Sequence, residues 1–117
     1  MKSHFIKYAV LLGVVLAISG FTAHAQSGDQ ENRQVKVINR ASAPIYHLYI
    51  SNVDEDNWGP DQLDWNESIG TNQYILINMD DGTGHCLYDI KAVLSDGREA
   101  VERHVNVCTI GTWTVYN

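Results

Sequence analysis

The sequence predicts an all-β protein, a small antiparallel β-sandwich of about six strands with one disulfide. Three observations lead to this prediction. From Gln34 onward apolar and polar residues alternate at a period of two, which is typical of half-buried strands. No window of helical length keeps an apolar stripe at i, i+3 and i+4. The two cysteines, Cys86 and Cys108, allow a single pairing.

Turn residues separate the runs that we expect to be strands. Pro44 suits the beginning of the second run, because proline lacks the N–H group that a central ladder needs. Asp96-Gly97 predicts a two-residue type I′ hairpin, since that turn requires positive φ at both central residues. The expected strands are residues 34–40, 45–50, 73–79, 86–94, 99–107 and 110–116. Modules of the immunoglobulin or transthyretin kind have this pattern, and a compact β-barrel is the alternative.

The predicted hairpin at Asp96-Gly97 also sets a register. It places two complementary charge pairs opposite each other, Asp89 with His104 and Lys91 with Glu102. Such pairs contribute about 0.2–1 kcal/mol each to stability.

The same register leaves Cys86 opposite Val107 rather than Cys108. We therefore predict a β-bulge near residues 105–107 that brings the two cysteines together. A disulfide closing this loop would stabilise the fold by about 3 kcal/mol.

Residues 1–25 have the three regions of a secretory signal. Lys2 and Lys7 lie in the first region, residues 8–18 form a short apolar run, and Ala23-His24-Ala25 is a small-x-small cleavage site. The apolar run is well short of the roughly 20 residues that cross a bilayer. We expect a secreted or periplasmic protein without membrane insertion after cleavage. Its expected organisation is a cleaved signal peptide at 1–25, a flexible leader at 26–33 and a single β domain at 34–117.

The part of the chain after residue 25 is strongly acidic. Two of the eight Lys and Arg precede residue 26 and all 14 Asp and Glu follow it, so the formal charge of residues 26–117 is 6 − 14 = −8. Binding to nucleic acid needs a surplus of cations that displace counterions, and we therefore expect none. The expected partner is an unidentified protein or envelope component.

Several short motifs resemble a group of small secreted proteobacterial proteins without an assigned activity. The motifs span almost the whole segment after the signal, in an order and spacing that are fairly distinctive. They are Asn39-Arg40, Ile45, Leu48-Tyr49-Ile50-Ser51, Trp58-Gly59-Pro60-Asp61-Gln62-Leu63, Cys86-Leu87-Tyr88-Asp89-Ile90-Lys91, Asp96-Gly97-Arg98 and Asn106-Val107-Cys108. Ile69-Gly70-Thr71-Asn72 departs from the Pro-Gly or Asn-Gly turn that the group often has there. The resemblance implies export and a β fold, and it implies no catalytic residue.

Aromatic residues suggest where a binding surface lies. All aromatic residues after residue 25 are Tyr or Trp, whose polar tips suit half-hydrated positions and interfaces. Strand periodicity places Tyr46 with Leu48 and Ile50 in the core. The candidate binding surface comprises Tyr49, Trp58, Asp61 and Trp65, mostly within the long irregular loop 52–66.

The acidic residues of this loop raise the possibility of a calcium site, because Ca²⁺ is bound by several carboxylate and carbonyl oxygens. Chain reversals in an up-and-down arrangement alternate between ends, so we expect the loop 52–66 to share an end with Asp96 and to lie away from Asp80 and Asp81. The candidate ligands are Asp54, Asp56, Asp61 and Asp96. Trp58 and Trp65 occupy positions where a calcium loop needs oxygen ligands, which favours a solvated acidic loop instead.

Enzyme chemistry finds little support in the sequence. His47, His85 and His104 lack metal-binding spacing, and neither a nucleophile elbow nor a phosphate-binding glycine loop is present. We expect a non-enzymatic binding module that uses the loop 52–66 and needs no cofactor. A calcium- or carbohydrate-binding module is the alternative, and a small enzyme is the third possibility.

Overall fold

The computed structural model describes residues 26–117, and the expected signal peptide at 1–25 lies outside the described residues. Six strands form two three-stranded sheets, and no helix occurs within the described range. The strands are β1 (Gln34–Asn39), β2 (Ile45–Asn52), β3 (Tyr74–Asn78), β4 (Leu87–Leu94), β5 (Glu99–Asn106) and β6 (Thr112–Val115). The all-β prediction and its six strands are confirmed.

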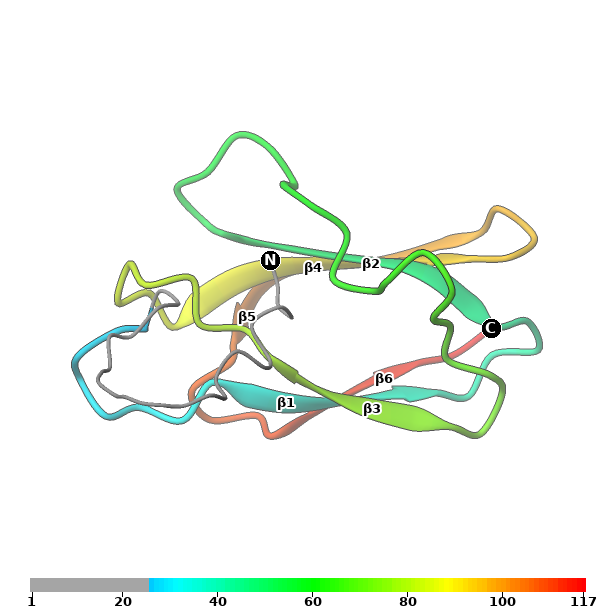
Figure 1. Ribbon diagram of the computed structural model, residues 1–117, viewed down its shortest axis with the longest axis horizontal. Helices are drawn as coiled ribbons and strands as arrows, with labels where there is room; N and C mark the ends of the chain where they lie inside the picture. Colours follow the sequence, from blue (N-terminus) through cyan, green and yellow to red (C-terminus); the bar gives the residue numbers. More distant parts are fainter. Residues whose placement is uncertain (1–25) are drawn as a thin grey trace, which may run out of the picture.

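The two sheets face each other as the layers of a sandwich (Figure 1). One has the order β3-β1-β6 and the other the order β2-β4-β5. Alternation along each strand turns one set of side chains inward, and sixteen apolar residues form the core between the layers. The most completely buried include Val35, Val37, Ile45, Leu48, Ile69, Met79, Ile90 and Ala92. The sandwich is therefore held by an ordinary apolar core in addition to its disulfide.

The strand pairs within the two sheets are not all antiparallel. β1 pairs with β3 antiparallel and with β6 parallel, so Val37 lies beside both Ile75 and Trp113. The remaining pairs, β2 with β4 and β4 with β5, are antiparallel. A purely antiparallel sandwich was expected, and the parallel β1–β6 pair is the departure from it.

Tyr46 is not a core residue, contrary to the expectation from strand periodicity. Ile45 pairs with Leu94 and His47 with Val93, so the ladder is irregular at Tyr46. This irregularity lets Ile45 and Leu48 both point inward and leaves Tyr46 49% exposed. One extra residue in the strand has changed which side chains of β2 face the core.

The β4–β5 hairpin also differs from the prediction. Leu94 N–H donates to the Arg98 carbonyl at 2.8 Å, which leaves the three-residue loop Ser95, Asp96 and Gly97. Within that loop only Gly97 has positive φ, at 90°. The predicted two-residue type I′ turn is wrong, since three-residue loops of this kind need a single left-handed residue.

The longer loop shifts the register and moves the bulge. Ile90 pairs with Glu102 and Lys91 with Val101, so the predicted facing of Lys91 and Glu102 is wrong. The register changes between Tyr88 and Ile90, where His104 has a φ of 57°. The bulge therefore lies at His104 opposite Asp89, one residue before the predicted range 105–107, and it does not bring Cys108 opposite Cys86.

The disulfide Cys86–Cys108 is present, with Cα atoms 5.3 Å apart. Val107 N–H still donates to the Cys86 carbonyl at 2.8 Å, so Cys108 reaches Cys86 just beyond the last ladder bond. A disulfide indicates an oxidising, extracytoplasmic compartment. Within residues 26–117 the structure contains no helix with the length and apolarity needed to cross a bilayer.

Residues 26–33, expected to be a flexible leader, make specific contacts with the domain. Arg33 is fully buried, and its guanidinium donates to both carboxylate oxygens of Asp29 at 2.9 and 2.6 Å and, through Nε, to the His85 carbonyl at 2.7 Å. Ser27 donates two hydrogen bonds to Asp80. The ion pair lowers the pKa of Asp29, first through the Arg33 hydrogen bonds. The buried arginine thus attaches the leader to the β4 end of the sandwich.

Candidate functional site

The segment between β2 and β3 runs back along the whole length of β2. Val53 N–H donates to the Leu87 carbonyl at one end, and Ile69 exchanges two backbone hydrogen bonds with Ile45 at the other. Midway, Gln62 N–H donates to the Leu48 carbonyl at 2.7 Å. We call residues 53–69 the crossing segment (Figure 1, green). It supplies most of the predicted binding residues.

Trp58 of the crossing segment lies on the outer face of sheet β2-β4-β5. The Lys91 ammonium is 5.0 Å from the Trp58 ring centroid and 5.2 Å from that of Tyr49. The Arg103 guanidinium lies 5.2 Å from the same Trp58 ring. Strand alternation directs Tyr49 of β2 and Lys91 of β4 to one face, because their neighbours Leu48, Ile90 and Ala92 point into the core. Arg103 of β5 reaches the same face, where it meets the Trp58 ring. The result is a cation–aromatic cluster built from three strands and a loop.

Two further side chains extend this cluster toward Asp61. His47 stacks on Tyr49 with ring centroids 6.2 Å apart, and His47 Nδ1 lies 2.6 Å from Asp61 Oδ2. Asp61 Oδ1 accepts the backbone N–H groups of Leu48 and Leu63, both at 3.0 Å. Asp61 therefore fastens the crossing segment to β2. We call the set Tyr49, Trp58, Lys91, Arg103, His47 and Asp61 the Trp58 surface.

Trp65, the fourth predicted binding residue, stands apart from this set. Its side chain is 95% exposed, and no ring contact or hydrogen bond of its side chain is present within the described residues. Burying a tryptophan removes a large apolar area from water, so binding of a partner over the exposed Trp65 would be favourable. Sequence reasoning thus identified Tyr49, Trp58 and Asp61, which the structure connects, and Trp65, which it leaves in solvent.

Lys91 and Arg103 were not predicted as part of any surface, and they differ in their pairing. Arg103 Nη1 donates to the buried Asp89 carboxylate at 3.1 Å, and Asp89 also accepts the His104 backbone N–H at 3.0 Å. The predicted side-chain pair of Asp89 with His104 is therefore replaced by these two contacts. Lys91 has no carboxylate partner within residues 26–117, and its ammonium group keeps its hydrogen-bond donors for water or a ligand.

A second polar network lies where the crossing segment begins. Asp54 Oδ2 is 2.7 Å from His85 Nε2, and His85 Nδ1 is 2.6 Å from the Thr83 hydroxyl. The hydroxyls of Thr83 and Tyr88 donate to Asp81 Oδ1 at 2.5 and 2.6 Å. No sequence pattern beyond the polar run around Asp81 pointed to this chain of contacts, because Asp54 and His85 are 31 positions apart.

The electrostatics of this network follow from burial and hydrogen bonding. Burial raises the pKa of Asp81, but the hydrogen bonds from Thr83, Tyr88 and Asn52 outweigh it, so the net pKa is below the ordinary value of 3.8. Burial, and then its bond to Asp81, raise the pKa of Tyr88 above the ordinary value of 10.0. Tyr88 therefore stays a neutral donor and Asp81 a charged acceptor at neutral pH.

A carboxylate, an imidazole and a hydroxyl in a row invite comparison with the groups of a hydrolase. Such chemistry also needs free backbone N–H groups that stabilise an oxyanion. The N–H groups of the nearby loop are already donated to side chains, at Asp81, Gly82, Thr83 and Gly84. Thr83 has its own hydroxyl hydrogen directed to Asp81. This arrangement can position the crossing segment, and those four N–H groups are not free to stabilise an oxyanion.

The candidate calcium ligands are distributed over different contacts. Asp54 pairs with His85, Asp61 with His47 and Asp96 with Arg98. Their ligand atoms do not gather: among the described residues, the one group of three or more within 4.8 Å is Glu31 with the two disulfide-bonded cysteines. The expectation that Asp54 lies near Asp96 is wrong, because the crossing segment begins beside Leu87 and His85, whereas Asp96 follows the opposite end of β4. Asn52 accordingly donates to Asp81 at 2.8 Å.

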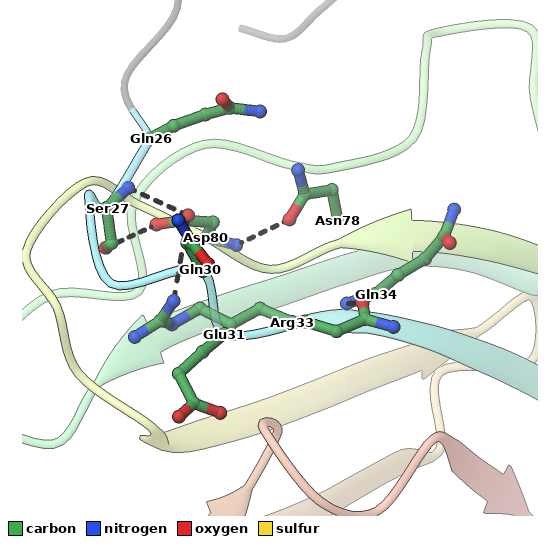
Figure 2. Close-up of a pocket in the computed structure, with 9 residues that line it drawn as sticks. Gln26, Ser27, Gln30, Glu31, Arg33, Gln34, Asn78 and Asp80 are labelled. Carbon is green, nitrogen blue, oxygen red and sulfur yellow. Dashed lines mark hydrogen bonds and ion pairs between the residues drawn. The ribbon is translucent and has the colours of Figure 1, made fainter.

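An open polar pocket of about 410 Å³ lies between the leader and the end of β3 (Figure 2). Figure 2 shows Arg33 along its floor and Ser27 bonded to Asp80. Its walls are mostly carboxamides, from Gln26, Gln30, Asn32, Gln34 and Asn78. Because the Arg33 guanidinium is occupied by Asp29, this pocket offers a ligand no free cation.

In comparisons with family models, curated proteins and solved structures, nothing matched the chain.

Proposed function

We propose that this protein is a non-enzymatic, secreted or periplasmic binding module, whose partner docks on the Trp58 surface and on Trp65. The observation that carries the proposal is the placement of Trp58, held by Lys91 and Arg103 beside Tyr49, with Trp65 95% exposed on the same crossing segment. Tryptophan, tyrosine and arginine are the residues that contribute most to protein–protein binding energy.

The scaffold supports this use of the crossing segment. Asp61 ties it to β2, Asp54 ties it to His85, and Ile69 pairs with Ile45. A loop that is fastened at several points loses little conformational freedom on binding, so more of the contact energy appears as affinity.

The chemistry of the surface suggests the kind of partner. Lys91 offers unpaired donors between two aromatic rings, and Arg103 is already neutralised by Asp89. The best complement is a macromolecular surface that places a carboxylate or carbonyl acceptor at Lys91 and apolar groups against Tyr49 and Trp65. A protein or another envelope component can supply both.

A carbohydrate is the second candidate ligand, because Tyr49 and Trp58 lie on one face beside a lysine. Aromatic rings present flat apolar surfaces, while Lys91 can donate hydrogen bonds to hydroxyl oxygens. A glycan array separates the two candidates. Binding to a defined sugar that is lost in Tyr49→Ala would favour the carbohydrate, and an empty array would remove it.

Affinity capture with matched variants tests the proposal. The protein would be immobilised with its disulfide intact, a partner captured from envelope extract and purified, and its Kd measured by calorimetry. We expect Trp65→Ala and Trp58→Ala each to weaken binding at least about thirtyfold, which corresponds to the roughly 2 kcal/mol of an interface hot spot. Tyr116→Ala, a 69% exposed aromatic beyond β6, is the control and should bind normally. Equal affinity of all four proteins would refute the Trp58 surface as the site.

A further inference from the structure

The four edge strands of the two sheets differ in how their free backbone groups are protected. An unprotected edge is a template for pairing with another strand, and proteins usually block it. At β2 the crossing segment does so, through the Gln62 bond to Leu48 and the two bonds between Ile69 and Ile45. This edge is closed.

The β5 edge is protected by charge and by irregular backbone. His104 has a φ of 57° at the bulge, which twists the strand out of a regular ladder. Glu99, Glu102 and Arg103 place charges along the same strand. Both features are recognised defences of an edge strand.

The β6 edge is short and has an acidic neighbour. Its strand has 4 residues, and the Trp113 indole N–H donates to Glu102 of β5 at 2.8 Å. This contact joins the two sheets along their common side and places the Glu102 carboxylate next to β6. A second strand approaching β6 would meet that charge.

β3 has none of these protections. The Gln73 carbonyl accepts the Asn39 N–H of β1 at 2.9 Å, and the Met79 N–H donates to the carbonyl of Arg33, just before β1, at 3.0 Å. Alternation therefore turns the N–H and C=O groups of Tyr74, Leu76 and Asn78 away from β1. Within residues 26–117 those groups have no backbone partner. The segment 73–79 contains no charged residue, proline or glycine. Figure 1 shows β3 at the front of its sheet, on the side away from β6.

Apolar surface remains on both sides of this edge. Tyr74 and Leu76 are 55% and 56% exposed on the outer face. Ile75 and Ile77 face inward but are only partly buried, whereas their pairing partners Val37 and Val35 have no exposed surface. A strand added beside β3 would cover apolar area on both faces.

We infer that β3 is the dimerisation edge of this protein and that its occupant is β3 of a second copy, antiparallel about a two-fold axis at Leu76. In this register Leu76 faces Leu76 and Tyr74 faces Asn78 of the other copy. Three facing pairs with two bonds each give six new backbone hydrogen bonds. The two sheets β3-β1-β6 become one continuous six-stranded sheet.

Charge explains why a second copy meets at this edge. Each copy carries −8 over residues 26–117, so most approaches set carboxylates against carboxylates. The uncharged segment 73–79 avoids this repulsion. The same register places Asn72 of one copy, which holds the Arg40 guanidinium at 3.1 Å, opposite Asp80 of the other, whose carboxylate also accepts two bonds from Ser27 and lies 3.8 Å from Arg33. Arg40 has no carboxylate partner of its own within the described part of the chain.

Charge-swapped variants test the pairing. The full chain would be exported, purified with its disulfide intact and measured by sedimentation velocity between about 10 µM and 1 mM, the range of weak self-association. We expect wild type to shift from monomer to dimer. Leu76→Glu and Leu76→Lys should each stay monomeric, because residue 76 faces its own copy, and their equimolar mixture should dimerise again. The fold of each variant is checked by circular dichroism.

Val101→Glu is the matched control, since Val101 is 46% exposed on the β5 edge and should leave the dimer intact. A wild type that is monomeric throughout the range would overturn the inference. So would a Leu76→Glu dimer as strong as that of wild type, or a mixture of the two charged variants that stays monomeric. Trp58→Ala should dimerise normally, which keeps this test independent of the proposed binding surface.

Discussion

The outer faces of the two sheets begin from the same arrangement and end differently. On each, a lysine of the central strand lies over a tyrosine of a flanking strand: Lys36 over Tyr74 at 4.5 Å, and Lys91 over Tyr49 at 5.2 Å. Only the Lys91 face receives a tryptophan, because the crossing segment returns over that sheet. Strand alternation can build similar surfaces on both sides, and the path of one long connection decides which of them becomes a composite site.

The largest predicted loss of stability comes from removing the disulfide of sheet β2-β4-β5, the sheet that the crossing segment covers. Replacing Cys86 and Cys108 together by alanine removes the constraint on the unfolded chain and should cost about 3 kcal/mol. We expect Tm in a thermal melt to fall by more than about 5 °C. The oxidised and reduced wild type provide the control pair. An unchanged Tm would show that the disulfide does not stabilise sheet β2-β4-β5, so that this sheet would be no more dependent on a covalent bond than sheet β3-β1-β6.

The next largest loss of stability tests how the crossing segment is joined to sheet β3-β1-β6, whose outer face it does not cover. The amide of buried Asn39 donates to the carbonyls of Ala43 and Ile69, both at 2.9 Å, and accepts the Ala41 N–H at 2.8 Å. Asn39→Ala takes the side-chain partner from the Ala41 N–H and the Ala43 carbonyl, and it removes one of the two donors to the Ile69 carbonyl, which keeps the Ile45 N–H. The change should cost about 2–3 kcal/mol in urea unfolding. Asn66→Ala, at an exposed site, is the control. Similar stability of both variants would mean that the segment is fastened elsewhere.

A smaller, pH-dependent effect tests the other end of the crossing segment. The folded pKa of Asp81 lies below 3.8, so its contribution to stability is present above about pH 4 and is lost as pH falls through the folded pKa. Asp81→Asn should cost about 1 kcal/mol at pH 7, a modest value because Asp81 is exposed. The difference from wild type should shrink at pH 3. A difference that stays constant with pH would contradict this, and Asp56→Asn is the control.

The smallest effect is expected at Trp65. Trp65→Ala should change the free energy of unfolding by less than about 0.5 kcal/mol, because an exposed side chain has little folded-state packing to lose. It should also remove the most red-shifted tryptophan emission, since Trp58 and Trp113 are more buried. A loss of more than about 1 kcal/mol in the free energy of unfolding would show that Trp65 packs against its own domain, which would contradict its proposed role in binding a partner.

Much of the fold was predictable, because alternation is a local signal. Val35, Val37 and Ile90 lie on the inner faces as their periodicity indicates, and the single cysteine pair formed. Tyr46 and the hairpin loop escaped prediction, since a bulge or a three-residue loop changes the phase without a distinct residue signature. The division into two sheets and the parallel pairing of β1 with β6 join residues far apart in sequence, for which a single chain offers no local cue.

The candidate site was predictable only in part, for a related reason. Aromatic enrichment in a long loop pointed to Trp58 and Trp65, but Lys91 and Arg103 belong to other strands and looked like ordinary exposed charges. Arg33 was missed because a lone arginine in a polar stretch carries no indication of burial. In each case the missing information was which strand lies beside which.

The parallel pairing of β1 with β6 has a consequence for how the chain is made. β1 is the central strand of its sheet, and one of its two neighbours is the last strand, ending at Val115. A chain still emerging from a ribosome cannot close that sheet until β6 is free to pair. Assembly then depends on joining opposite ends of the chain, which is a slow kind of contact to form. The order in which the strands are synthesised therefore differs from the order in which they can pair, because β1 cannot complete its sheet before β6 has been made.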